Sequence, residues 1–73
     1  MTEVTIRFFM KLTDDTIERF EGLVLNTGEK ITGRVSSGFW FKTSRSPIAI
    51  LTDIEAAGWD LDADFDQIEF CYH

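Results

Sequence analysis

A chain of 73 residues with a net charge of −6 has room for one domain, residues 1–73, with a thin core. Its hydrophobic content of 44% argues against disorder, and its apolar runs are far shorter than the roughly 20 residues that a membrane span needs. The N-terminus shows no signal peptide pattern, and one cysteine excludes an intramolecular disulfide. We therefore expect a cytoplasmic protein that does not bind a membrane.

Hydrophobic periodicity predicts six elements. In chain order they are a strand over 4–12, a helix from 15 that ends between 22 and 28, strands over 30–35 and 39–43, a helix over 47–57 and a strand over 67–72. The order β-α-β-β-α-β in so short a chain is that of the ferredoxin-like fold, an α+β architecture. It predicts a four-stranded antiparallel sheet with two helices on one face, and with the first and third strands at its centre.

Local signals set the boundaries in the first half of the chain. Asp15 and Glu18 form a capping-box pattern at the start of the first helix, and Gly22 is a candidate for an early end. Residues 36–38, Ser-Ser-Gly, form a hairpin loop in which Gly38 would adopt a positive φ.

In the second half, Ser46 and Pro47 have the pattern of an N-cap followed by the first residue of a helix. A rival interpretation makes residues 48–51 a strand, followed by a short helix. Gly58 would end the longer helix.

The charges are distributed unevenly. All seven Lys and Arg residues lie in the first 45 positions, whereas the residues from Ser46 onward include seven acids and no base. Such a segment repels nucleic acid and favours a basic protein surface, although it can also serve solvation alone.

Acidic and apolar side chains alternate within residues 59–66. The acids are Asp60, Asp62, Asp64 and Asp66. A calcium loop of the EF-hand type would need Gly and Glu where this chain has Phe65 and Cys71, so we expect no metal and no cofactor. We expect an extended segment with Trp59 and Phe65 packed on the core and the aspartates facing a basic partner. The spacing of the aspartates also resembles a phosphate backbone, so a nucleic-acid mimic is an alternative hypothesis.

Phe39, Trp40 and Phe41 form an aromatic run in a predicted central strand. Because successive side chains point to opposite faces and the helices cover one face, either Trp40 or the pair of phenylalanines must lie on the open face. Phe9 would join them there, unless the C-terminal segment folds back over the patch. The basic residues predicted beside this patch are Arg7, Lys11 and Lys42. Exposed aromatic patches usually mark binding sites.

Signals for chemistry are weak. The only histidine, His73, is terminal and would be poorly held beside Cys71, and no phosphate loop or zinc pattern is present. An RNA-recognition surface would use aromatics on the same two strands, but the negative net charge disfavours it. We expect a protein that is not an enzyme and does not bind nucleic acid directly.

The opening strand, Met1–Phe9, and the C-terminal end without Lys or Arg carry a resemblance to a known class of proteins. The chain resembles small phage-encoded proteins that bind host RNA polymerase, inhibit initiation and promote antitermination. The resemblance implies a polymerase subunit as partner, in the host cytoplasm, and altered initiation and termination. Anti-CRISPR proteins share this size and acidity, so an inhibitor of a nucleic-acid-binding effector is an alternative.

The sequence thus predicts a non-enzymatic inhibitor or modulator that binds a protein, without deciding between monomer and homodimer. The predicted partner-binding residues are Arg7, Phe9, Phe39, Trp40, Phe41, Lys42, Asp60, Asp62, Asp64 and Asp66.

Overall fold

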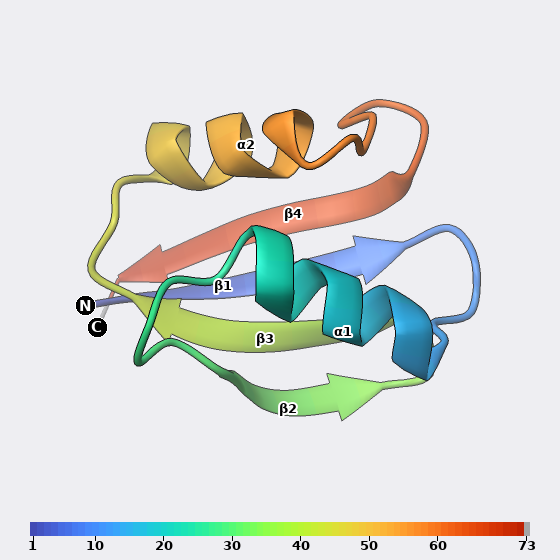
Figure 1. The fold of residues 1–73 in the computed structure, drawn as a ribbon, viewed down its shortest axis with the longest axis horizontal. Helices are drawn as coiled ribbons and strands as arrows, with labels where there is room; N and C mark the ends of the chain where they lie inside the picture. Colours follow the sequence, from blue (N-terminus) through green and yellow to red (C-terminus); the bar gives the residue numbers. More distant parts are fainter. Residues whose placement is uncertain (73) are drawn as a thin grey trace.

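The computed structural model describes residues 1–72, which form one antiparallel sheet of four strands and two helices (Figure 1). The elements are β1 (Thr2–Phe8), α1 (Asp14–Leu23), β2 (Ile31–Val35), β3 (Gly38–Thr43), α2 (Pro47–Ala56) and β4 (Phe65–Tyr72). The strand order β2-β3-β1-β4 puts β1 and β3 at the centre, as predicted, and the fold is α+β and ferredoxin-like. Neither helix is long and apolar enough to cross a membrane.

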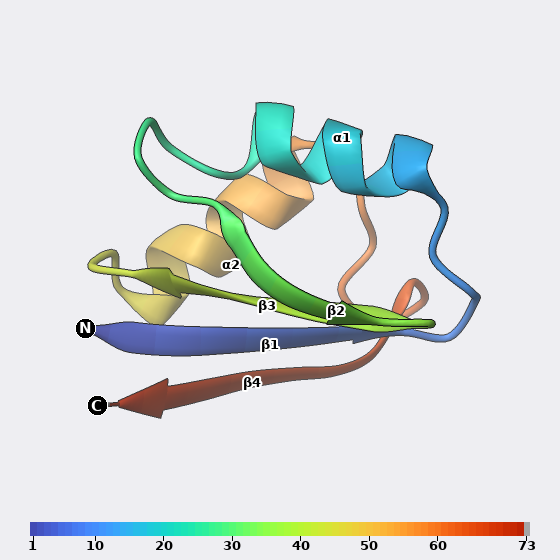
Figure 2. The ribbon, with the colours of Figure 1, turned by 90° about the horizontal axis from the view of Figure 1, so that it is seen from below.

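Both helices lie on one side of the sheet (Figure 2). The core between these two layers is built from alternate residues of the central strands and from the inner faces of the helices. Its fully buried hydrophobic members are Val4, Ile6, Phe20, Val24, Phe39, Phe41, Ile50 and Ile54. The ring of Phe20 on α1 packs edge-on against that of Phe39, with centroids 4.7 Å apart. The opposite face of the sheet has no helix over it.

The first strand is shorter than predicted, because β1 ends at Phe8 and not at Leu12. The pairing of β1 with β4 shifts register between Arg7 and Phe8. Beyond this irregularity the chain is held by the loop between β2 and β3. The N–H of Phe8 donates to Ser37 O at 2.8 Å, and the N–H of Leu12 donates to Ser36 O at 2.9 Å.

Two other local predictions in this half were wrong. Helix α1 begins at Asp14, and its cap is Thr13, whose side chain accepts from the N–H of Thr16 at 3.3 Å. Gly38 belongs to β3 and has no positive φ. It is needed for close approach instead, because a Cβ there would lie 2.6 Å from Ile6 O.

The second half follows the sequence pattern closely. Residues 48–51 are helical, and Ser46 caps α2 by accepting from the N–H of Ala49 at 3.3 Å. Gly58 has a φ of 100°, as a residue just past a helix end requires. Strand β4 begins at Phe65, two residues before the predicted start.

Arg45, in the connection between β3 and α2, joins four segments of the chain. Its guanidinium donates to Glu29 Oε1 at 2.6 Å, to Asp53 Oδ2 at 2.5 Å and to Val24 O at 2.9 Å. Its backbone N–H donates to Thr43 Oγ1 at 3.1 Å. Because the side chains of Arg45 and Glu29 are only 14% and 13% exposed, these charges depend on each other for the hydrogen bonds they lost with water.

The carboxyl of Glu29 is the second centre of this network. Partial burial raises its pKa. Hydrogen bonds from Arg45, from the Thr43 hydroxyl and from the N–H of Asn26, together with the charge of Arg45, lower the pKa by more than burial raises it. The net result is a pKa below the ordinary value of 4.5. The folded state therefore favours the ionised carboxylate more than the unfolded chain does.

We expect Arg45→Ala to destabilise the fold by about 3 kcal/mol, because it leaves the carboxylate of Glu29 buried without its partner. The control is Arg34→Ala, which removes an exposed ion pair with Asp14 and should cost less than about 1 kcal/mol. Urea unfolding followed by circular dichroism measures both values. Equal losses for the two variants would contradict the central role of Arg45.

The lowered pKa of Glu29 also predicts a pH dependence. A group whose pKa falls on folding contributes stability that is present above its unfolded pKa and is lost as the pH falls through the folded value. The stability difference between wild type and Glu29→Gln should therefore be largest above about pH 5 and shrink in more acidic solution. Thermal melts at pH 7 and pH 3 test this, and a difference that does not change with pH would refute it.

Candidate functional site

Three of the predicted site residues share the open face of the sheet. In the pairing of β1 with β3, Arg7 lies opposite Gly38 and Thr5 lies opposite Trp40. Alternation along the strands then puts Arg7, Trp40 and Lys42 on the face that the helices leave uncovered. Of the two arrangements that the sequence allowed, the structure adopts the one with Trp40 outside and its neighbours inside.

Trp40 is partly buried, although no helix covers it. Its indole lies over Gly33 of the neighbouring strand β2, where an added Cβ would come within 2.2 Å of the ring. The ring thus fills the space that the missing side chain leaves and shields the backbone of β2. Trp40 therefore has a role in the sheet itself.

The other aromatic residues predicted for this patch are not there. Phe39 and Phe41 are fully buried in the core, so they cannot contact a partner. Phe9 follows the end of β1, four residues beyond Thr5, which is the residue opposite Trp40. The prediction that Phe39 and Phe41 contact a partner was therefore wrong.

The aspartate run is folded into a tight turn and is not extended. The N–H of Asp64 donates to Asp60 O at 3.0 Å. The Asp60 carboxylate accepts from the N–H groups of Asp62 and Ala63, at 2.8 and 3.1 Å, and the Asp64 carboxylate accepts from the N–H of Asp60 at 2.8 Å. Short polar side chains often bond to nearby backbone in this way. The evenly spaced row of carboxylates that the sequence predicted does not form.

The apolar residues of this segment pack as predicted. Phe65 is 5% exposed, and Trp59 and Leu61 pack against the core. The carboxylates of Asp60, Asp62, Asp64 and Asp66 are all on exposed residues. Within residues 1–72 no group of three or more His, Cys, Asp or Glu side chains is placed to hold a metal ion.

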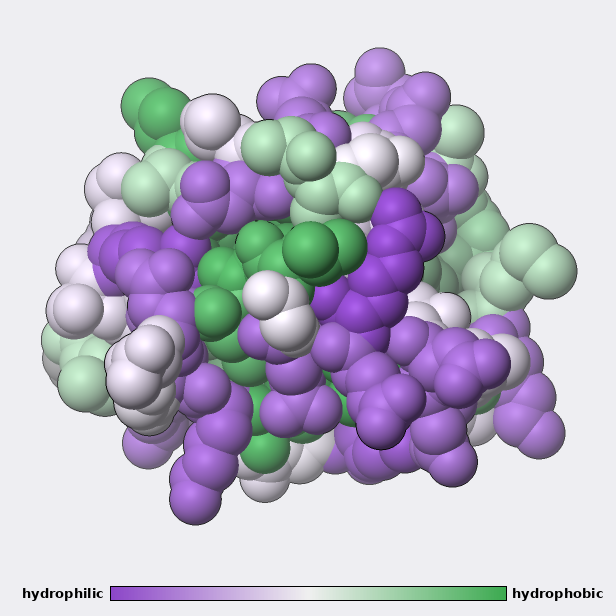
Figure 3. Space-filling view, in the orientation of Figure 1, coloured by the Kyte–Doolittle hydropathy of each residue, from purple (hydrophilic) through white to green (hydrophobic). Residues whose placement is uncertain are grey.

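Exposed hydrophobic side chains gather in separate areas. On the face with the helices, a hydrophobic area lies near the middle of the molecule, surrounded by hydrophilic residues (Figure 3). Leu23, at the end of α1, is 57% exposed. More exposed are Phe9 and Met10, at 64% and 79%, in the loop that leads from β1 to α1. Exposing two consecutive large apolar side chains to water costs free energy, so the position of Phe9 and Met10 calls for an explanation.

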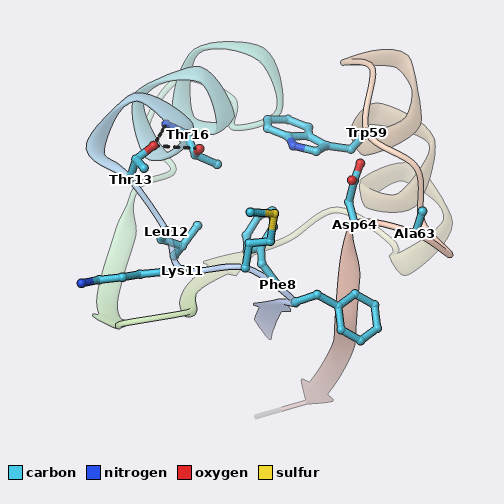
Figure 4. A pocket seen from close by; sticks show the side chains of 10 residues that line it. Phe8, Lys11, Leu12, Thr13, Thr16, Trp59, Ala63 and Asp64 are labelled. Carbon is cyan, nitrogen blue, oxygen red and sulfur yellow. Dashed lines mark hydrogen bonds between the residues drawn. The ribbon is translucent and has the colours of Figure 1, made fainter.

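Phe9 and Met10 border a cleft of about 310 Å³. Its inner wall is apolar, with Phe8 and Leu12 only 9% and 6% exposed. Figure 4 shows Thr13, the cap of α1, and Thr16 on one side, and Trp59 and Asp64 on the other. We call Phe9, Met10 and this cleft the β1–α1 rim. This rim was not predicted from the sequence, although a run of three apolar residues from Phe8 to Met10, which strict alternation cannot bury, was a signal that could have indicated it.

The walls of the cleft are held firmly. Arg19 donates to Ala57 O at 2.7 Å, and its guanidinium lies 4.5 Å above the ring centre of Trp59. The Trp59 ring also packs on Phe20, with centroids 5.4 Å apart. The loop itself is bonded to the turn formed by residues 60–64, which we call the acidic turn, because the N–H of Phe9 donates to Asp64 O at 3.3 Å. The rim is therefore preformed.

Comparisons with known proteins do not assign this site. No protein-family model, curated protein or solved structure matches the chain. Of the two residues considered for nucleophilic chemistry, Cys71 is exposed on β4 and His73 lies outside the described residues.

The packing of Trp40 on Gly33 makes a testable prediction. Gly33→Ala should destabilise the fold by about 1–3 kcal/mol, because its methyl group would overlap the indole. Gly22→Ala is the matched control: its Cβ meets nothing within 4 Å inside a helix, so it should stabilise by about 0.5–1 kcal/mol. In a Trp40→Ala background the penalty at Gly33 should vanish. Chemical unfolding of the four variants checks this, and a persistent penalty would contradict it.

Proposed function

We propose that this chain is a non-enzymatic binding protein that modulates another protein in the cytoplasm, and that the partner docks on the β1–α1 rim. The observation that carries the proposal is the exposure of Phe9 and Met10 beside an apolar cleft. Aromatic residues and methionine are enriched at protein interfaces, and burying each such side chain contributes about 2 kcal/mol.

The rim is also well suited to binding because it is already ordered. The loop is bonded at Phe8 and Phe9 on one side and at Leu12 on the other. A partner would therefore gain the burial of Phe9 and Met10 without first ordering the backbone that carries them. Preorganisation of this kind raises affinity by lowering the entropy lost on binding.

Acidic residues outnumber basic ones near the rim, and this excess favours a basic partner. Asp64 and Lys11 both line the cleft, and Asp60 and Asp62 lie in the same turn as Asp64. Asp14, which is paired with Arg34, and Asp15 lie at the start of α1, next to Thr13 on the opposite wall. A surface with an apolar group at its centre and Lys or Arg around it would fit, since opposite charges steer association.

A subunit of bacterial RNA polymerase is the first candidate partner, and the likeness of the chain to polymerase-binding phage proteins is what supports it. Binding there would alter initiation and termination in the host cytoplasm. An effector that binds nucleic acid is the second candidate, because such proteins also carry basic surfaces.

Two functions that do not involve a protein interface are less well supported. A nucleic-acid mimic would need its carboxylates in a row, whereas those of Asp60 and Asp64 bond to the backbone of their own turn. RNA binding by stacking would need several aromatics on the open face, whereas Phe39 and Phe41 are buried.

The test is affinity capture from a bacterial lysate with the wild-type chain and with the double variant Phe9→Ser, Met10→Ser. We expect polymerase subunits that remain bound after nuclease treatment, and their loss with the double variant. Leu23→Ser, which removes a comparably exposed apolar side chain on the helix face, is the control and should retain the partner.

Other outcomes would refute parts of the proposal. Equal capture by the wild type and the double variant would exclude the rim as the interface. If Asp62→Lys abolishes capture while the double variant does not, the acidic turn alone binds, as a mimic would. Capture that nuclease removes would indicate nucleic acid as the ligand.

A further inference from the structure

The two edges of the sheet differ in how well they are protected. Strand β2 has five residues, includes Arg34, and has an irregularity between Ile31 and Gly33. Strand β4 has eight residues without Lys, Arg or Pro, and it pairs regularly with β1 from Gln67 to Tyr72. Proteins usually block exposed edges with short strands, bulges, lysines or prolines. In residues 1–72 no strand pairs with the outer side of β4, and its regular part has none of these devices and a single charged side chain, Glu69.

The free edge also carries apolar surface. Ile68 and Phe70 face the helix side but are only partly buried. Tyr72, at the end of the strand, is 74% exposed. Met1 and Ile48 are 71% and 75% exposed, and β1 and α2 both begin at this end of the molecule (Figures 1 and 2). A strand added beside β4 would cover part of this surface.

The sequence of β4 is complementary to itself in one register. In antiparallel pairing, directly opposite side chains share a face, so a twofold axis normal to the sheet must pass through a residue position. An axis at Phe70 puts Phe70 opposite its own copy, Ile68 opposite Tyr72 and Glu69 opposite Cys71. All pairs on the helix side are then apolar, and no like charges are directly opposite.

Neighbouring registers are worse. An axis at Glu69 would put two carboxylates directly opposite each other, which destabilises a sheet. An axis at Ile68 would put Phe70 opposite Asp66. An axis at Cys71 would pair only residues 70–72 of the described strand, against 68–72 for the axis at Phe70.

We propose that a second copy of this chain is the partner of the β4 edge, and that two chains pair antiparallel about Phe70 to form a continuous eight-stranded sheet. The contact is isologous, so it closes as a dimer and does not propagate. It uses the Tyr72 end of β4. The β1–α1 rim lies at the other end of the strand, near Phe65. Both rims therefore stay free at the two outer ends of the dimer.

The test is sedimentation equilibrium of the purified chain at micromolar concentrations. We expect a mass twice the 8.4 kDa of one chain. Because each chain carries a charge of −6, added salt should strengthen the dimer by screening repulsion between the copies. A monomer at every concentration and salt level would overturn the proposal.

Cysteine cross-linking tests the register in a Cys71→Ser background. Phe70→Cys should form a disulfide-linked dimer on mild oxidation, because directly opposite Cα atoms lie about 5 Å apart, within disulfide range. Ile68→Cys is the matched control on the same face and should not cross-link, because its copy would lie four residues away along the strand. Cross-linking of the control alone, or of both equally, would overturn the register. So would a disulfide through native Cys71 in the unmodified chain, which would place the axis at Cys71.

Discussion

The hydrogen-bond network of the largely buried guanidinium of Arg45 is the interaction on which the rest of this small fold depends. It binds the end of α1 through Val24 O, the following connection through Glu29, and α2 through Asp53. A two-layer domain of this size has a core only one side chain deep between its helices and its sheet, so little apolar burial is available to orient the helices. One cation with partners in several segments sets how both helices lie against the sheet. Breaking it would expose charges that the fold has removed from water.

How much of this could be predicted from the sequence depends on how local each feature is. The order of the elements, the cap at Ser46 and the burial of Phe65 follow from periodicity and short-range signals. The network of Arg45 could not be predicted, because its partners Glu29 and Asp53 are 16 and 8 residues away and nothing in the sequence pairs them. Only the packing of the two layers brings these groups together.

In the candidate site, too, the features that follow from local sequence patterns were predicted and those that depend on the folded structure were not. The expectation that Trp40 or its neighbours lie outside came from alternation, and the structure resolves it in favour of Trp40. The β1–α1 rim was missed because the sequence pattern of alternation continues through Phe9, whereas the strand in the structure ends at Phe8. The register shift between Arg7 and Phe8 redirects the backbone, as bulges do, and it leaves Phe9 and Met10 outside the core. Likewise, the alternating aspartates form a turn because their carboxylates bond to nearby N–H groups more readily than strand geometry allows.

The two tryptophans of this chain lie on opposite sides of the sheet, in different surroundings. Trp40 rests on the backbone at Gly33 on the uncovered face, whereas Trp59 lies under the guanidinium of Arg19 in the wall of the cleft. Each indole is therefore a natural fluorescent probe of one face. In a chain with only Trp59, a shift in the wavelength of maximum emission or a change in quenching would report contact at the cleft. In a chain with only Trp40, the same change would report contact on the open face of the sheet. Fluorescence of the two single-tryptophan chains therefore distinguishes which side of the molecule a ligand has covered.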